Sequence, residues 1–360
     1  MKQSMSLIKT LLFWLKYLVY LMFASFILLE VTFRILPVSD SLKVQSINEE
    51  NPIYHFAKNR IVTQQIGFNF THTNKKKINN YGFMSDKDYL SHDLKEKDLA
   101  VVIGDSYVEA RQVKNSDTFH FILDQEIESF NVYPLGTSGS QLSQYLAYAD
   151  FAITEFNPDI LIFLLYSNDF DESWYEVKQK PGFHYFTKNG HLNLKEYSPS
   201  ITKQLARESA FIRYLFLDLK IMTQIKKILA SDNNVENRVI NTNSNNEKLG
   251  MQAIDFFLKN IEELAKTKKI ILMIDGDRSS IYNGKIKRDM SKLQNRWFKI
   301  ILNQMGIKTN LHLLDLHPVF LKNWKKNKKK FDYEYDGHWN EHGHEIVAKA
   351  LVNKMIKLQE

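Results

Sequence analysis

The chain has 360 residues, of which 44% are hydrophobic and 25% are charged, a composition that suits one core domain with attached segments and excludes a disordered chain. It contains no cysteine, which excludes disulfides, zinc–thiolate sites and a cysteine nucleophile. The formal charge is +7, with lysine-rich runs at 75–77 and 325–330. No zinc finger, helix-turn-helix or RNA-binding aromatic pattern accompanies these lysines, so we interpret them as solvated loops and expect no nucleic-acid partner.

The first predicted element is a membrane-spanning helix. Residues 11–29 are apolar except for Lys16 and are long enough to cross a hydrocarbon core of about 30 Å. Lys2 and Lys9 precede this stretch, and no comparable basic cluster follows it closely. The positive-inside rule therefore predicts a cytoplasmic N-terminus and an extracytoplasmic remainder. A cleaved signal peptide is the rival interpretation, but the stretch is long and no clean A-x-A site closes it, so we expect residues 1–37 to be a retained anchor.

The segment after the anchor shows no sustained hydrophobic period. Glu30 and Arg34 are spaced i, i+4 and are predicted to pair where the helix leaves the membrane. Residues 38–97 are polar and mixed, and include the stretch NNYGF at 79–83. We interpret them as a linker and an irregular lead-in.

From residue 98 onward, short apolar runs alternate with amphipathic segments. The runs are bounded by turn or charged residues and predict five strands, at 99–103, 130–133, 160–165, 270–274 and 311–314. Helical patterns lie between them, at 119–123, 142–156, 254–265 and 297–305, and a last helix is predicted over 341–358. This alternation predicts an α/β domain over 98–358, a doubly wound, flavodoxin-like sheet of five parallel strands in three α/β/α layers.

One stretch, residues 171–250, breaks the alternation. It predicts a hairpin, a helix over 205–229 and a flexible polar loop that includes residues 231–234 and the asparagines of 241–246. We interpret it as an insertion near the active edge of the sheet. A lid, a specificity element and a spacer all remain open as its role.

Polar residues follow several of the predicted strands. In doubly wound folds, ligands bind at the carboxyl ends of the strands, which is where Ser106 and Asn168 fall. Ser106 begins an amphipathic segment, so it is either a helix cap or, next to a base, a nucleophile. The stretch DGDR at 275–278 follows the fourth strand, so Asp275 also falls at this edge; lining of the pocket is one interpretation of the stretch, and we favour an ordinary turn.

Three histidines near the C-terminus compete for the role of base. His338 lies two residues after Asp336 and outside the last helix, so the carboxylate can reach its imidazole. His342 and His344 lie at or inside the helix start, where capping or packing would occupy them. The cluster over 338–344 is also compatible with a metal site, although no H-E-x-x-H motif occurs.

Donors for a developing oxyanion are available between the nucleophile and the base. The backbone N–H of Gly139, in the loop LGTSGSQ at 135–141, can approach a ligand closely, and the amide of Asn168 would point across the same sheet edge. Ordinary turn roles are the alternative for Gly136, Gly139 and Asn168.

These residues together carry a family resemblance. A Gly-Asp-Ser block ending at Ser106, followed in order by Gly139, Asn168 and an Asp-x-His pair at Asp336 and His338, resembles the SGNH (GDSL-type) hydrolase superfamily. The resemblance implies that serine is the nucleophile, histidine the base and aspartate its orienting acid. It also implies an oxyanion hole made of the backbone N–H groups of Ser106 and Gly139 with the side-chain amide of Asn168.

The chain departs from the family pattern in two places. Many members have Asp-x-x-His, whereas the block DGHWN at 336–340 is similar to that of alginate-type O-acetyltransferases. The third block usually reads Gly-x-Asn-Asp, and here Tyr166 and Ser167 replace its opening. Trp339 is either a core residue or a platform for a sugar ring.

The resemblance and the anchor together imply a membrane-anchored serine esterase or O-acetyltransferase. The expected substrate is a small ester or an acylated extracytoplasmic glycan, in the periplasm or at the cell surface, near envelope polysaccharide machinery. The expected lipid contact is through residues 11–29, and neither a metal nor an organic cofactor is needed. A catalytically inactive glycan-binding module and a metal-dependent hydrolase that uses the histidines of 338–344 are the alternatives.

Overall fold

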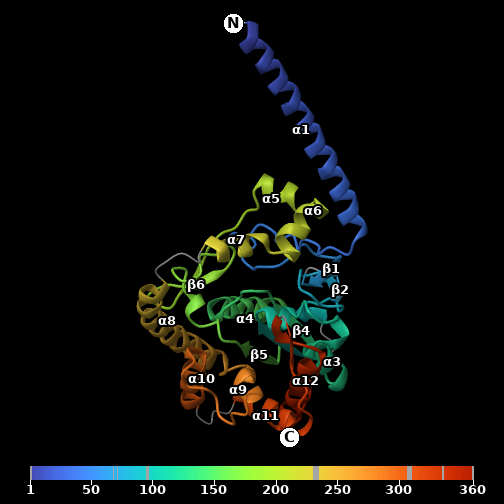
Figure 1. Cartoon of the computed structure of the whole chain (residues 1–360). Coiled ribbons are helices and arrows are strands. Elements are labelled where there is room, and N and C mark those ends of the chain that lie inside the picture. The colour runs from blue at the N-terminus through green and yellow to red at the C-terminus, as the bar shows by residue number, and fades with distance from the viewer. Residues whose placement is uncertain are drawn as a thin grey trace. The chain divides into compact units, whose positions relative to one another are not determined.

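The computed structural model describes residues 2–67, 69–70, 72–94, 97–229, 235–305, 310–334 and 336–358 (Figure 1). The chain divides into two compact units. The first comprises residues 1–41, 63–73 and 200–231, and the second comprises residues 42–62, 74–199 and 232–360.

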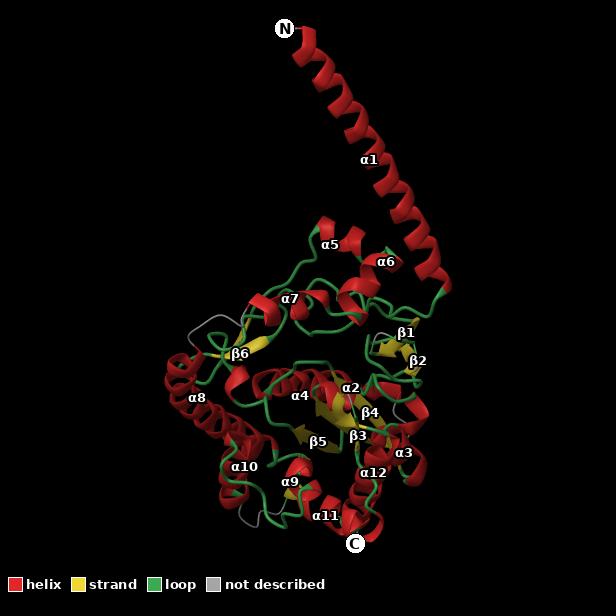
Figure 2. Cartoon of the chain, in the orientation of Figure 1, coloured by secondary structure: helices red, strands yellow, loops and turns green. Residues whose placement is uncertain are grey.

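The second unit is built on a five-stranded sheet (Figure 2). The strand order is β4-β3-β5-β8-β9 and every neighbouring pair is parallel. Their bounds are β3 (Asp98–Gly104), β4 (Phe130–Gly136), β5 (Ile160–Leu165), β8 (Lys269–Ile274) and β9 (Leu311–Asp315). Each strand covers one of the predicted apolar runs, so the expected α/β class and the five parallel strands are confirmed.

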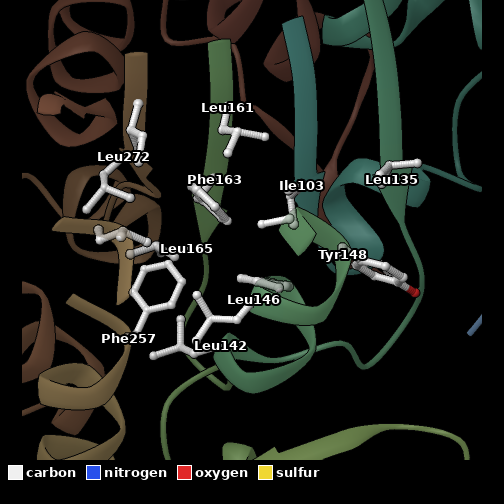
Figure 3. Close-up of a cluster of buried hydrophobic side chains, with 14 of the residues drawn as sticks. Ile103, Leu135, Leu142, Leu146, Tyr148, Leu161, Phe163, Leu165, Phe257 and Leu272 are labelled. Atoms are coloured by element: carbon white, nitrogen blue, oxygen red, sulfur yellow. The ribbon is translucent and has the colours of Figure 1, made fainter. Parts of the chain in front are cut away.

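Helices cover both faces of this sheet. Alternate residues of a strand point to opposite faces, so Val101 and Ile103 belong to one buried cluster while Ala100 and Val102 belong to another. The first cluster packs against α4 (Leu142–Phe156), α8 (Val235–Leu264) and α10 (Leu293–Gln304) (Figure 3). The second packs against α3 (Phe119–Glu126), α11 (Leu316–Asn327) and α12 (Glu341–Ile356). The three-layer arrangement predicted from the sequence is therefore confirmed.

The remaining elements of the second unit are short. They are the helices α2 (Ser106–Glu109) and α9 (Arg278–Tyr282), the 3-10 turns η1 (His92–Leu94), η2 (Asn115–Asp117) and η3 (Asp171–Ser173), and two antiparallel pairs. The pairs are β6 (His184–Phe186) with β7 (Leu192–Leu194) and β10 (Asp332–Tyr333) with β11 (Asp336–Trp339). The hairpin expected in the insertion is β6–β7.

The segment interpreted as a linker and lead-in is largely built into the fold. It forms β1 (Arg60–Ile66) and β2 (His72–Ile78), which pair in a two-stranded sheet. The lysines of 75–77 lie on β2 and Lys76 is fully buried, so the expectation of a solvated loop there is wrong. Ile47, Phe56 and Ile78 are buried in a third apolar cluster, and Tyr89 stacks on Tyr133 of β4 with 4.2 Å between ring centroids. A polar segment without a hydrophobic period therefore contributes its few aromatic and branched residues to the core.

The asparagine-rich part of the insertion is not a loop. Residues 241–246 lie within α8, which continues to Leu264 and buries Ile254 and Phe257 on the sheet. The expectation of a flexible loop over 241–246 is wrong, because the packing of the later turns extends the helix through residues of low intrinsic propensity. The other part of the predicted loop, residues 231–234, lies outside the described residues.

The first unit contains the predicted membrane helix. α1 (Lys2–Ile35) includes a stretch, Thr10–Ile35, that is long and apolar enough to cross a membrane, with a mean hydropathy of 2.0 and none of it buried. The guanidinium of Arg34 lies 2.8 Å from the carboxylate of Glu30, so the predicted pair is confirmed. The rest of this unit includes α5 (Ile201–Ala206), α6 (Ala210–Arg213), the π-helical turn η4 (Tyr214–Asp218) and α7 (Ile221–Leu229), which replace the single helix predicted over 205–229.

Candidate active site

Ser106 stands at the start of α2, directly after the buried strand β3. The carboxylate of Asp105 accepts a hydrogen bond from the backbone N–H of Tyr107 (3.0 Å) and so caps this helix. Ser106 is therefore not the residue that caps α2, because Asp105 performs that role. The hydroxyl of Ser106 is left half-buried and directed to other partners.

Those partners come from the far end of the chain. The Oγ of Ser106 lies 2.7 Å from Nε2 of His338, and Nδ1 of the same ring is hydrogen-bonded to Oδ1 of Asp336. The backbone N–H of His338 also donates to that carboxylate oxygen (3.1 Å). Asp336 therefore fixes both the backbone and the imidazole orientation of His338. A carboxylate that accepts from Nδ1–H leaves Nε2 free to accept the serine proton.

The electrostatics of Asp336 agree with this arrangement. Burial alone would raise the pKa of Asp336, but the hydrogen bond and the charge of His338 outweigh burial and lower this pKa below its ordinary value. The Nε2–H group of Gln112 donates to the second carboxylate oxygen (3.3 Å). Asp336 therefore stays ionised and can stabilise an imidazolium on His338.

A competing acceptor lies next to the serine. Oδ2 of Asp105 is 3.2 Å from Oγ of Ser106, farther than Nε2 of His338. Burial raises the pKa of Asp105 from its ordinary value. The single hydroxyl proton can point to only one acceptor at a time, and the shorter contact favours His338.

Arg278 holds the histidine loop in place, a role that sequence reasoning missed. Its guanidinium donates to the carbonyl of Gly337 (2.9 Å) and to the hydroxyl of Tyr107 (2.6 Å), and that hydroxyl donates to the same carbonyl (2.8 Å). The ring of Tyr107 packs on the imidazole of His338, with 4.8 Å between ring centroids. One buried arginine thus ties the residue after the serine to the residue before the histidine.

Two carboxylates hold Arg278 itself. Asp275 and Asp332 accept from its guanidinium at 3.1 Å and 3.2 Å. Asp275 also accepts from the indole N–H of Trp339 (3.2 Å), and this tryptophan is fully buried. Trp339 is therefore a core residue and not a surface platform. The interpretation of the DGDR stretch as an ordinary turn is wrong, since two of its side chains support the loop that carries His338.

The two expected oxyanion donors follow the strands on either side of β3. Gly139 follows β4 and has φ +84°, a backbone conformation that favours glycine. Asn168 follows β5, and its amide donates to Glu172 (3.3 Å). Lys178 donates to the carbonyl of Gly139 (2.8 Å) and is ion-paired with Glu172, so it joins the two loops. One N–H of the Asn168 amide remains for a ligand.

Asp169, beside Asn168, keeps the loop after β5 in shape. One of its carboxylate oxygens accepts from the hydroxyl of Tyr145 (2.9 Å) and from the backbone N–H of Tyr166 (2.6 Å). Burial, and then the negative charge of Asp105, raise the pKa of Asp169 well above its ordinary value. The sequence offered this residue only as the fourth position of a family block, and the contacts show a structural acid.

The other two histidines of the cluster face different surroundings. The Nδ1 atom of His344 accepts from the backbone N–H of Phe119 (3.2 Å), and the ring is buried. His342 packs on the ring of Phe331 and lies 3.6 Å from Glu345. Over the part of the chain that the structure describes, no group of three His, Asp or Glu side chains is arranged to hold a metal ion. His338, His342 and His344 are therefore not brought to one point.

Comparisons with known proteins give distant similarity. No protein-family model and no curated protein matches the chain. A member of the lipolytic protein G-D-S-L family from Veillonella parvula DSM 2008 is 13% identical, with a TM-score of 0.39 over 71% of this chain and 96% of its own. The acetyl xylan esterase AlAXEase is 15% identical, with a TM-score of 0.41 over 71% of this chain and 98% of its own. The psychrotrophic esterase EstA from Pseudoalteromonas sp. is 12% identical, with a TM-score of 0.38 over 72% of this chain and 98% of its own. At this level of similarity, the functional assignment rests on the geometry of the site.

Proposed function

We propose that the chain is a membrane-anchored serine hydrolase of the SGNH type that acts on acyl esters. The observation that carries the proposal is the chain of contacts from Ser106 Oγ to His338 Nε2, at 2.7 Å, and from His338 Nδ1 to Asp336. A serine hydroxyl is a weak nucleophile at neutral pH and becomes effective when an oriented base can take its proton. The contacts of His338 with Ser106 and Asp336 support this proposal.

In the first half of the reaction, the Oγ of Ser106 forms a bond to the ester carbonyl carbon while Nε2 of His338 takes its proton. The carbonyl oxygen becomes an oxyanion, which the N–H groups of Ser106 and Gly139 and the amide of Asn168 hold. When the oxyanion collapses, the bond to the alcohol oxygen breaks. The alcohol leaves with the proton from His338, and an acyl-serine remains.

In the second half, a hydroxyl group attacks the acyl-serine and gives its proton to His338. Water gives a carboxylic acid, which is the esterase reaction, and a sugar hydroxyl gives a new ester, which is the transferase reaction. In both, the bond to Ser106 Oγ breaks and the serine recovers its proton. Asp336 stabilises the imidazolium in each half.

The proposed substrate is an acyl ester, most simply acetyl, on an extracytoplasmic glycan. Three features support this choice: the membrane-length helix, the excess of lysine on its N-terminal side, and the DGHWN block that resembles alginate-type O-acetyltransferases. Alkaline phosphatase fused after residue 40 is expected to be active in a bacterial host. An inactive fusion would overturn the proposed orientation.

Labelling with a fluorophosphonate probe tests the catalytic proposal. The probe reacts with a serine that has both an activating base and an oxyanion pocket, so the full-length chain should be labelled and the Ser106→Ala variant should not. Equal labelling of the two proteins would show that Ser106 is not the nucleophile. If the chain binds glycan without turnover, and Ser106→Ala does not change the binding, the result would favour the binding module. If turnover survives Ser106→Ala and is lost on addition of a chelator, the result would favour the metal-dependent alternative.

Supplying an acetyl donor with and without a glycan acceptor separates hydrolysis from transfer. A transferase should move the acetyl group to the glycan and release less free acetate when the acceptor is present. An unchanged yield of free acetate, with no acetylated glycan, would show that the chain is not a transferase.

A further inference from the structure

Large apolar side chains are exposed in the helical segment 200–229. Single exposed apolar residues are normal on a protein surface, whereas a concentrated group marks an interaction surface. Six of them lie between positions 201 and 225, with exposed fractions from 41% to 76%: Ile201, Leu205, Phe216, Leu217, Met222 and Ile225. The segment belongs to the same compact unit as the membrane-length helix α1.

The end of α1 holds this segment through a carboxylate. Glu30 accepts hydrogen bonds from the backbone N–H groups of Ala210 and Phe211, both at 3.1 Å, and from the hydroxyl of Ser209 (2.6 Å). These N–H groups begin α6, where the helix has no internal acceptors for them. The guanidinium of Arg34 adds a hydrogen bond to the carbonyl of Glu208 (3.2 Å). The polar contacts therefore fix the start of α6 against the last turns of α1.

Aromatic contacts fix the same two helices side by side. Phe33 stacks on Tyr214, with 4.3 Å between ring centroids, and on Phe211, with 5.6 Å. Phe26 meets Phe211 edge to face at 6.0 Å, about two helical turns earlier along α1. The segment thus lies beside residues 26–34 of α1.

The length of α1 indicates where its contact with α6 lies relative to the hydrocarbon core of the bilayer. Residues 10–35 make 26 positions of helix, about 39 Å at 1.5 Å per residue, whereas the hydrocarbon core is about 30 Å thick. An anchor that enters the core near Leu11 therefore leaves it near Glu30. The residues that contact α6 lie across this exit, so α6 and its neighbours fall at the boundary between acyl chains and headgroups.

The composition of the segment suits that boundary. Residues 200–229 hold six basic and two acidic residues among the apolar ones. In α7, the apolar residues Ile221, Met222 and Ile225 share one face, and Thr223 lies on the opposite face. Helices of this kind bury the apolar face in the acyl boundary and place basic residues among anionic headgroups.

We propose that residues 200–229 form an interfacial membrane element, in which α5, α6 and α7 lie on the surface of the bilayer that α1 crosses. The six exposed apolar side chains enter the acyl boundary of the outer leaflet. This assigns to part of the insertion a second attachment to the lipid surface. The inference is independent of the catalytic proposal, because none of these residues belongs to the candidate active site.

The absence of cysteine from the sequence makes a direct test practical. Single cysteines replace Leu205, Phe216 or Ile225 in the full-length chain, and Thr223→Cys is the matched control on the opposite face of α7. Each variant is spin-labelled and placed in single-copy nanodiscs of phosphatidylethanolamine and phosphatidylglycerol. Collisions of the label with oxygen, which enters lipid, are compared with collisions with a water-soluble nickel chelate.

The ratio of oxygen to nickel collisions should be several-fold higher at the three apolar positions than at position 223. A ratio at these positions equal to that of the control would show that the face lies in water and would overturn the proposal. Few collisions with either reagent would show that protein covers the face, which also overturns it. The replaced side chains are exposed, so the variants should keep the circular dichroism spectrum and melting temperature of the parent chain.

Discussion

The Oγ of Ser106 and Nε2 of His338 lie 2.7 Å apart, although the two residues are 232 positions apart in the sequence. Ser106 follows β3, which lies between β4 and β5 in the sheet, and His338 lies on β11, just before the last helix. Asp336 orients the imidazole, and Arg278 with Tyr107 ties the residue after Ser106 to the residue before His338.

Removal of either partner should abolish ester hydrolysis. Ser106→Ala and His338→Ala are each expected to lower kcat by roughly 10⁴- to 10⁶-fold, because the nucleophile and its base act as one unit. For the same reason, the double variant should be no slower than the slower single variant. The measurement is turnover of 4-nitrophenyl acetate by the full-length chain in detergent. If the fold-loss in kcat of the double variant equalled the product of the two single losses, the two side chains would act separately.

Asp336→Asn should leave the fold intact and still cost roughly 10⁴-fold in kcat. The asparagine amide would donate to Nδ1 of His338, which forces the ring proton onto Nε2. Nε2 could then no longer accept the proton of Ser106. Fluorophosphonate labelling should slow in parallel with turnover, while the melting temperature stays close to that of the parent chain. Parental rates would mean that Asp336 is not the orienting acid.

Replacement of Arg278 by lysine should reduce kcat as well as stability. Lysine keeps the charge but loses the planar fork that reaches both Gly337 and Tyr107. A small displacement of His338 is expected to lower kcat about 10²-fold. Here kcat is calculated per active site, with the number of active sites measured by fluorophosphonate labelling. Arg288→Lys is the matched control, because the side chain of Arg288 is 8% exposed and is also paired with an aspartate, Asp315.

The control should lose stability without losing kcat per titrated site. Both variants keep the charge but lose hydrogen bonds of a guanidinium that is paired with an aspartate, so their melting temperatures should fall together. If Arg278→Lys and Arg288→Lys had the same kcat per titrated site, Arg278 would be a structural residue only. Its contacts to Gly337 and Tyr107 would then not affect the rate of the reaction.

The chain should lose stability in mild acid because of His120. Burial, and then the nearby charge of Lys76, lower the pKa of His120 from 6.5 to about 3. Above pH 6.5 the side chain is neutral in the folded and the unfolded chain, so it adds no pH dependence. Below pH 6.5 the unfolded chain binds a proton that the folded chain does not, and stability falls as the pH falls.

The expected loss from His120 is about 2 kcal/mol between pH 7.5 and pH 5. His120→Gln removes the titrating group and can still donate to the carbonyl of Val108, which His120 contacts at 3.1 Å. Urea midpoints of the two proteins at both pH values give the comparison. An equal shift in parent and variant would show that other groups account for the acid sensitivity.

The sequence was sufficient to predict the sheet and the contact between Ser106 and His338, for different reasons. Strands such as β5 are buried on both faces, so they appear as uninterrupted apolar runs with clear ends. Ser106 and His338 were recognisable because each occurs in a short block of residues whose order along the chain is informative. Neither signal depends on knowing which segments meet in space.

The support of the site was not predictable in the same way. Arg278 acts through Tyr107 and Gly337, which lie far away in the sequence, and the stretch around it has the composition of a turn. Asn241 and its neighbours suggested a loop because asparagine is a weak helix former, whereas the packing of the later turns of α8 decides their conformation. Both errors arise where a tertiary contact overrides a local preference.

The charge on Lys180 should strengthen the backbone N–H of Gly139 as a hydrogen-bond donor to the proposed oxyanion. Its ammonium donates to the carbonyl of Ser138 (3.2 Å), and the N–H of this same peptide unit belongs to Gly139, so a charge on Lys180 makes that N–H a better donor. Burial, and then Lys178, lower the pKa of Lys180 to about 8. Lys180→Met is therefore expected to lower kcat about tenfold with little change in KM, less than the 10²- to 10³-fold loss that follows removal of an oxyanion donor. In the parent chain kcat should fall as the pH rises through 8, whereas Lys180→Arg, which stays charged, should keep its rate. A parental pH profile in Lys180→Arg would mean that the charge on this side chain does not reach the oxyanion.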